Sequence, residues 1–158
     1  MTDIRPFNGI RFNQDLVKDV GAVLCPPYDV ISPDMQHALY HKSPYNMVRL
    51  EHGLAQPGDS LLRDKYAHAA DTFREWLGSG ILKPDPSPAM YLHHHYFHDE
   101  GKVKTRRGIM AGVRLEEWEQ AVVRPHEGTA AVFKIDRLNL LRSCHASFSP
   151  ILSLYEDP

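Results

Sequence analysis

The segment His126-Glu127-Gly128-Thr129 concentrates residue types that could do chemistry. His126 and Glu127 supply a base and an acid, Gly128 lets a ligand approach the backbone, and Thr129 is a competent helix cap. The N–H groups and the positive dipole end at the start of a helix favour phosphate or carboxylate ligands. The segment therefore predicts a site for a small anionic ligand where a loop gives way to a helix.

Two cations follow in the helix that we expect after this segment. Lys134 and Arg137 lie three residues apart, so they can flank one helix face and clamp a phosphate. The alternative is a solvated face that also carries Asp136, with Thr129 only a cap and Glu127 in a surface ion pair with a neighbouring cation. Surface ion pairs contribute little to stability, so the sequence leaves both interpretations open.

Two earlier segments offer further candidates for binding. Asp29 follows Tyr28 in a loop with two consecutive prolines, which lower the entropy cost of holding a substrate-orienting carboxylate. Alternatively, Asp29 makes a local turn bond and Tyr28 packs in the core. Arg49 lies between two apolar residues of an expected strand, where a cation is usually ligand-facing or paired, here with Glu51 or Asp29.

The amino-acid composition limits which classes of binding partner we expect. The 158 residues include 18 basic and 20 acidic side chains, so the formal charge of −2 gives no global field for nucleic acid or an anionic membrane. A basic patch around Arg106-Arg107 has few interleaved aromatics and favours a hairpin face over a nucleic-acid groove. Two distant cysteines predict neither zinc site nor disulfide, and the absence of an 18-residue apolar run predicts a cytoplasmic protein without membrane contact.

Histidines gather in one expected strand. His93 and His95 share one face, while His94 and His98 share the other. Two imidazoles could meet on one ion, but a catalytic zinc usually needs a third protein ligand from elsewhere. We therefore predict no metal at these residues.

Apolar periodicity, prolines and glycines predict an α+β fold, with a mixed or antiparallel sheet packed with two long helices, in a single domain over residues 1–158. The longer helix shows one apolar face through Tyr66, Phe73 and Trp76. The expected helices are residues 32–41, 59–77 and 129–142, with a short helical turn at 116–121. The expected strands are residues 46–50, 89–98, 103–115 and 150–155, of which 89–98 and 103–115 form a hairpin.

Several short motifs occur in an order that resembles the N-terminal part of a bacterial and archaeal family, the domain of unknown function DUF1015. Its members carry downstream a Gly-His-His-Arg motif like that of ParB-type and serine-kinase proteins. The nearest string here, His93-His94-His95, lacks the glycine and the arginine, so the chain resembles an N-terminal fragment. The motifs are Pro26-Pro27-Tyr28-Asp29-Val30-Ile31, Asn46-Met47-Val48-Arg49-Leu50, Arg107-Gly108-Ile109-Met110-Ala111, His126-Glu127, Asp136-Arg137-Leu138, and Ser149-Pro150-Ile151 through Leu154-Tyr155.

The resemblance implies ATP-dependent phosphotransfer to a small hydroxylated metabolite such as free L-serine, with Mg²⁺ accompanying the ATP. In this hypothesis Glu127 activates the acceptor hydroxyl and His126 orients it, while Tyr28, Asp29, Arg49, Gly128, Thr129, Lys134 and Arg137 bind substrate or nucleotide. The alternatives are a non-catalytic nucleotide- or metabolite-binding regulatory module and a ParB-like nucleic-acid-associated protein. We expect the fragment alone to be inactive. An exposed apolar patch at residues 151–155, or a homodimer across it, is also expected.

Overall fold

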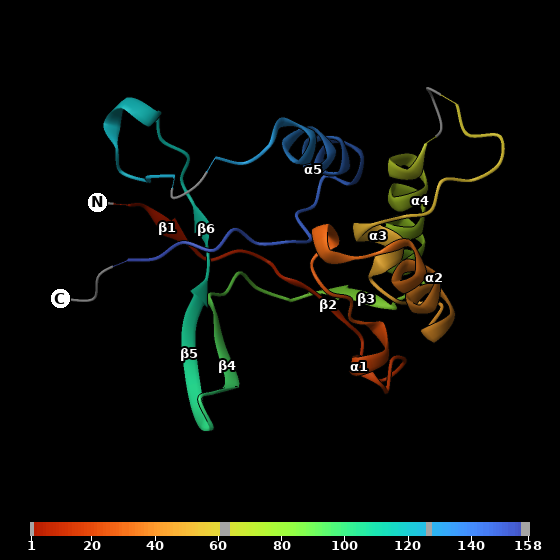
Figure 1. Ribbon diagram of the computed structural model, residues 1–158, viewed down its shortest axis with the longest axis horizontal. Coiled ribbons are helices and arrows are strands. Elements are labelled where there is room, and N and C mark those ends of the chain that lie inside the picture. Colours follow the sequence, from red (N-terminus) through yellow and green to blue (C-terminus); the bar gives the residue numbers. More distant parts are fainter. Residues whose placement is uncertain (1, 61–63, 126–127, 156–158) are drawn as a thin grey trace. The chain divides into compact units, whose positions relative to one another are not determined.

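The computed structural model has an α+β fold and describes residues 2–60, 64–125 and 128–155 (Figure 1). The prediction of this fold class is confirmed. The strands are β1 (Ile4–Arg5), β2 (Ile10–Phe12), β3 (Leu82–Pro84), β4 (Tyr91–Asp99), β5 (Lys102–Met110) and β6 (Gly112–Val113). The helices are α1 (Val20–Val23), α2 (Pro33–Lys42), α3 (Val48–Glu51), α4 (Lys65–Gly78) and α5 (Ala131–Cys144), with 3-10 turns at Tyr28–Val30 and Trp118–Gln120.

The chain forms two compact units. The first comprises residues 1–11 and 84–128, and the second comprises residues 12–83 and 129–158. Among the described residues, the first unit holds the longest strands and the second holds the five α-helices. In the described part, no helix has the length and apolar character needed to cross a membrane. A single domain over residues 1–158 stays a prediction.

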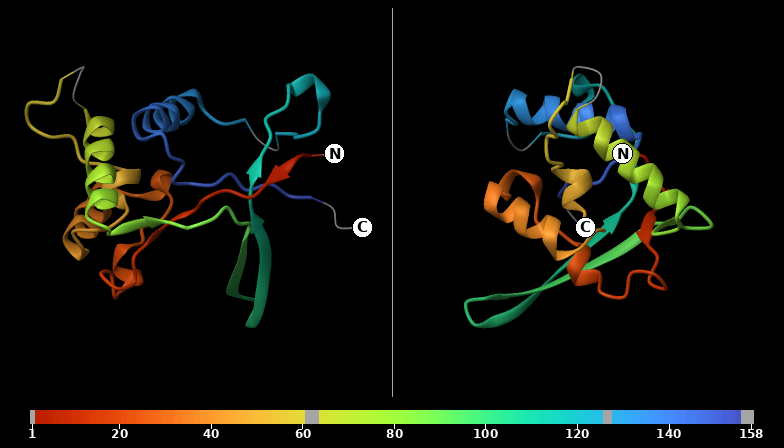
Figure 2. Two further views of the ribbon diagram at one scale, coloured as in Figure 1. Left: turned by 180° about the vertical axis from the view of Figure 1, so that it is seen from behind. Right: turned by 90° about the vertical axis from the view of Figure 1, so that its right-hand side faces the viewer.

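The first unit is dominated by a long antiparallel hairpin of β4 and β5, drawn as an extended ribbon in Figure 2. Its nine cross-strand pairs run from Tyr91 opposite Met110 to Asp99 opposite Lys102. The two turn residues, Glu100 and Gly101, have φ angles of 49° and 73°. Positive φ at both central positions matches the twist of a two-residue hairpin turn. The hairpin prediction is confirmed.

Tyr91 anchors the base of this hairpin. Its hydroxyl donates to the Asp85 carboxylate at 2.7 Å and accepts the N–H of Gly9 at 2.8 Å. Arg11 donates its Nε–H to the same carboxylate at 2.9 Å. A Cβ at Gly9 would lie 2.6 Å from the Tyr91 hydroxyl oxygen, so only glycine fits this contact. Segments about 80 residues apart in the chain are thereby held together.

The helices of the second unit begin where their sequences supply caps. Ser32 accepts the N–H of Met35 at 3.2 Å, and Pro33 occupies the first helical turn, so α2 forms as predicted. Asp64 accepts the N–H groups of Tyr66 and Ala67 at 2.9 and 3.0 Å, so α4 begins at Lys65. The predicted start at residue 59 was wrong because apolar spacing alone does not reveal the cap.

The core of the second unit lies between these helices. Phe73 and Trp76 of α4 are 6% and 3% exposed, which confirms the predicted register of its apolar face. Phe148 packs edge-to-face on Phe73 at a centroid distance of 5.3 Å, and α4 packs against α3 and α5. The buried members of the cluster are Val17, Val23, Leu50, Ala69, Ala70, Phe73, Trp76, Ile81, Leu82, Leu140 and Cys144.

The expected buried strand at residues 46–50 is instead the one-turn helix α3. The burial was correctly predicted, since Val48 and Leu50 are fully buried, but a short apolar run does not distinguish strand from helix. Asn46 decides the outcome. Its side chain accepts the Val48 N–H at 3.0 Å and donates to the Ala22 and Leu24 carbonyls at 2.8 and 3.0 Å, which starts the helical turn.

The expected strand at residues 150–155 is also absent from the described chain. These residues have no regular structure, because a strand needs a partner whose backbone groups satisfy its own. Ile151 and Leu154 are about nine-tenths exposed, as the expected apolar patch requires. The expected homodimer stays a prediction.

Candidate functional site

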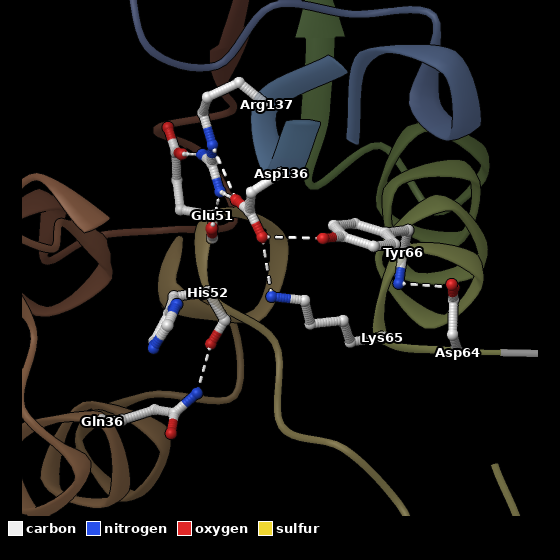
Figure 3. A network of polar contacts seen from close by, with 8 residues as sticks. All are labelled: Gln36, Glu51, His52, Asp64, Lys65, Tyr66, Asp136 and Arg137. Carbon is white, nitrogen blue, oxygen red and sulfur yellow. Dashed lines mark hydrogen bonds and ion pairs between the residues drawn. The ribbon is translucent and has the colours of Figure 1, made fainter. Parts of the chain in front are cut away.

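Four charged side chains of the second unit form a cluster between α3, α4 and α5. Glu51 ends α3, Lys65 begins α4, and Asp136 and Arg137 lie in the second turn of α5. Figure 3 shows their charged groups pointing toward one another, with Tyr66 reaching in from α4. Two cations and two carboxylates balance the charge. We call these five residues the charged cluster.

Arg137 is the most heavily bonded member. Its Nη1 donates to Glu51 Oε2 at 2.6 Å, its Nη2 donates to the Glu51 carbonyl at 2.8 Å, and its Nε donates to Asp136 Oδ2 at 3.0 Å. The second Glu51 oxygen accepts the Ser149 hydroxyl at 2.6 Å. The guanidinium lies 3.7 Å from the ring centroid of Tyr28, within cation–π range. Most of its five donors are therefore engaged within the protein.

Asp136 joins the two halves of the charged cluster. Its Oδ1 accepts the Lys65 ammonium at 2.8 Å and the Tyr66 hydroxyl at 2.7 Å, while Oδ2 faces Arg137. Burial opposes ionisation, but the hydrogen bonds from Lys65, Arg137 and Tyr66 outweigh it and lower the pKa of Asp136 to about 2. The carboxylate is thus ionised throughout the neutral range and is a weak base.

Lys65 and His52 lie where the charged cluster opens. A cavity of about 10 Å³, close to the room that one water molecule needs, is lined by both residues together with Glu51, Tyr66 and Arg137. Burial and the Lys65 charge lower the pKa of His52, so its imidazole is neutral at pH 7. An ammonium has three donors, and Asp136 accepts one from Lys65. A small polar ligand could therefore meet an ammonium and a neutral imidazole here.

The double-proline loop reaches the same region through Tyr28. Besides its contact with Arg137, Tyr28 packs edge-to-face with Phe133 of α5 at a centroid distance of 6.0 Å. Asp29 is exposed. The sequence thus led to Tyr28 and Arg137 separately, and the structure brings the two together.

Arg49 does not contact Tyr28 or Arg137. Its guanidinium donates to the Tyr40 carbonyl at 2.8 Å and stacks 4.3 Å from the Tyr40 ring centroid, rather than pairing with Glu51 or Asp29. Within the described residues, its buried Nε has no hydrogen-bond partner. This contact holds α2 to α3, because Arg49 lies on a helix instead of the expected strand.

The predicted loop-to-helix junction is described only in part, because His126 and Glu127 lie outside the described residues. Thr129 does not cap α5. The capping position belongs to Ala130, which makes no side-chain cap bond, and the helix begins at Ala131. Gly128 and Lys134 are exposed, while Arg137 turns toward Glu51. Lys134 and Arg137 therefore do not hold a common group.

Glu51, Lys65 and Tyr66 belong to the charged cluster but were not among the site residues predicted from the sequence. Glu51 carried one signal, because it directly follows residues 46–50, which the sequence predicted to be buried; the structure leaves it only 7% exposed. A buried carboxylate requires a cation or several donors. Lys65 and Tyr66 gave no comparable signal, because their positions at the start of α4 depend on the Asp64 cap.

No group of three or more His, Cys, Asp or Glu is placed to hold a metal ion among residues 2–60, 64–125 and 128–155. The carboxylates of Glu51 and Asp136 both already accept hydrogen bonds from cations. A hard divalent ion at these oxygens would have to displace Arg137 or Lys65.

The chain is an α+β protein with a charged cluster between its helices, and its sequence can be compared with models of known protein families. A family model described as "Protein of unknown function (DUF1015)" matches residues 4–158. The chain belongs to this family. No curated protein and no solved structure matches it.

Proposed function

We propose that this chain provides the acceptor-binding part of an ATP-dependent small-molecule kinase whose acceptor is a hydroxylated amino acid such as free L-serine. The observation that supports this most is the charge pattern of the charged cluster, in which two cations alternate with two carboxylates. An amino acid is a zwitterion, and its carboxylate and ammonium need opposite charges a few ångströms apart. Alternating charges complement such a molecule better than a simple anion.

Lys65 is the residue we assign to the substrate carboxylate. It is about one-third exposed, whereas the better-bonded Arg137 is about one-quarter exposed and already engaged by Glu51 and Asp136. Its ammonium keeps donors that can turn toward a ligand. When Lys65 turns from Asp136 to the substrate carboxylate, Asp136 would hold the substrate ammonium in its place without taking its proton, because its low pKa makes it a poor base. Arg137, stacked on Tyr28, fixes the positions of both carboxylates.

Phosphoryl transfer depends mainly on positioning and charge stabilisation, so the base contributes less than the placement of the hydroxyl. We retain Glu127 as the group that activates the hydroxyl and His126 as the group that orients it. Gly128 and Thr129, close to the start of α5, would contribute backbone N–H groups to the nucleotide phosphates. Mg²⁺ would accompany ATP as part of the nucleotide substrate.

Isothermal titration calorimetry with L-serine, and with L-alanine as the matched ligand without the hydroxyl, tests this proposal. We expect L-serine to bind and L-alanine to bind more weakly. Lys65→Gln should weaken L-serine binding about tenfold or more, because a charge-assisted hydrogen bond is lost. Lys18→Gln, at an exposed lysine of the same unit, should leave binding unchanged. Equal binding of the two amino acids, or equal effects of the two variants, would contradict the proposal.

A non-catalytic metabolite-binding module is the second candidate. The observation that favours it is the low pKa of Asp136, which makes the most perturbed carboxylate of the charged cluster a binding group rather than a base. Both candidates predict L-serine binding. They differ in turnover when ATP, Mg²⁺ and L-serine are supplied together to a full-length member of the family, because the fragment alone is expected to be inactive. ADP formation that depends on L-serine and is lost in Glu127→Gln would identify the kinase.

A further inference from the structure

The hairpin of the first unit carries a row of rings on one face. His93, His95 and Phe97 occupy alternate positions of β4, so their side chains leave the same side of the ribbon. The ring centroids of His93 and His95 lie 6.3 Å apart, and those of His95 and Phe97 lie 5.4 Å apart, with interplanar angles of 39° and 40°. His93 and His95 are exposed and Phe97 is half-buried. We call this side the ring face.

A row of cations lies beside the rings on the same face. Across the hairpin, Lys104 is opposite Phe97 and Arg106 is opposite His95, and directly opposite residues share a face. Lys102 continues the row toward the turn. Cations at alternate strand positions are about 6.6–6.8 Å apart, which is twice the spacing of about 3.4 Å per charge along one strand of a nucleic-acid duplex.

The charge of the hairpin differs from that of the chain. Residues 91–110 contain four lysines and arginines but only two acidic residues, whereas the whole chain has a formal charge of −2. Asp99 forms an ion pair with Lys104. Among the described residues, Lys102 and Arg106 have no ion pair, although the Arg106 guanidinium lies 5.7 Å from the Phe97 ring centroid. The ring face is therefore locally cationic.

We propose that the ring face binds single-stranded nucleic acid without strict sequence preference. Aromatic rings on which successive bases stack, flanked by cations that follow the phosphates, are the two elements of such sites. An acidic polypeptide would use the cations but not a continuous row of rings. In a duplex the bases are already stacked, so the ring face would meet only the backbone. Both rows together fit a strand with unstacked bases.

This inference departs from the expectation drawn from net charge and composition. The sequence suggested few aromatics among the cations because rings and cations occur in different segments of the chain. Antiparallel pairing interleaves them, since His95 and Arg106 are 11 residues apart in sequence but directly opposite in space. Gly108 is opposite His93 and leaves the end of the ring row without a covering side chain.

Fluorescence anisotropy of the whole chain with a labelled 15-nucleotide oligothymidylate at low salt tests the proposal. We expect measurable binding that weakens with salt, with a slope of log K against log salt near −2 for three phosphate contacts. Lys102→Gln combined with Arg106→Gln should reduce that slope to about −0.7. A duplex and an abasic oligonucleotide of the same length should bind at least about fivefold more weakly, because one stacked base contributes about that factor.

Matched variants on the opposite face provide the control. Arg106→Gln and Arg107→Gln remove the same charge from neighbouring positions whose side chains leave opposite faces, so only the first should weaken binding several-fold. Phe97→Leu and Tyr96→Leu make the same comparison for the rings. Equal losses within either pair, binding of the abasic oligonucleotide as tight as oligothymidylate, or no binding by the unmodified chain would each overturn the proposal. The abasic comparison uses the unmodified chain and is independent of how the variants fold.

Discussion

Replacing Asp136 with Asn should destabilise the second unit strongly. The pKa of Asp136 is lowered from the ordinary value of 3.8 to about 2, and each pKa unit corresponds to about 1.4 kcal/mol. Its side chain is 17% exposed, so solvent screens the interaction only partly. We therefore expect the ionised carboxylate to contribute about 2 kcal/mol at pH 7. An amide also leaves Lys65 and Arg137 with an unpaired charge, which raises the total cost to about 2–4 kcal/mol.

The contribution of the Asp136 carboxylate to stability should depend on pH. Because the pKa is lower in the folded state, the contribution is present above the unfolded pKa near 4 and is lost as the pH falls toward 2. The unmodified chain and Asp136→Asn differ in their free energy of unfolding, and the share of this difference that comes from the lowered pKa should therefore fall to about half at pH 3. Raising the pH above 7 should leave it unchanged.

Urea unfolding followed by tryptophan fluorescence measures this difference. Trp76 is buried in the core of the second unit, and Trp118→Phe as a common background makes it the single tryptophan of the chain. Asp15→Asn, at an exposed aspartate of the same unit, is the matched control and should change stability by less than about 0.5 kcal/mol. An Asp136→Asn variant as stable as this control, or a difference that is the same at pH 7 and pH 3, would refute the assigned role.

Three further predictions concern the second unit. Phe73→Ala should cost roughly 3–5 kcal/mol in urea unfolding, because the side chain is 6% exposed and packs on Phe148; a cost below about 1 kcal/mol would contradict the packing. Asn46→Asp should destabilise at least as much as Asn46→Ala, since a carboxylate would face the two carbonyls that the amide now serves, and the opposite order would show that the amide is misassigned. Burial raises the pKa of the Cys25 and Cys144 thiols to about 11, so both should react slowly with a thiol reagent at pH 8 and rapidly in urea; fast reaction of the folded chain would place at least one of them at the surface.

Local signals predicted the elements that local chemistry controls. Ser32 and Pro33 marked the start of α2, and the apolar spacing through Phe73 and Trp76 gave the register of α4. The glycine in the turn between two alternating segments gave the hairpin. Each of these features depends on interactions between residues close in sequence, so a single chain without relatives reveals them.

The parts of the fold and of the charged cluster that the sequence did not predict depend on contacts between residues distant in the chain. Residues 46–50 read equally well as strand or helix, and the bonds from Asn46 to carbonyls more than 20 residues earlier settled the choice. The charged cluster joins Glu51 to Arg137, 86 residues apart, so it could not be assembled from spacing. The sequence nevertheless identified Arg137, through its spacing from Lys134, and Tyr28, through the double-proline loop and the family resemblance.

The two-residue turn of Glu100 and Gly101 determines more than the shape of the hairpin. It sets the phase between the strands, so that His95 is opposite Arg106 and Phe97 is opposite Lys104. A single residue inserted there would shift the pairing by one and turn one strand's side chains over. His95 would then face Arg107 and Phe97 would face Thr105, and the three alternating cations would be carried to the side of Leu92 and Tyr96. The composition would be almost unchanged, but only Arg107 would remain beside the rings of His95 and Phe97, so the length of this turn determines which rings and cations share a face.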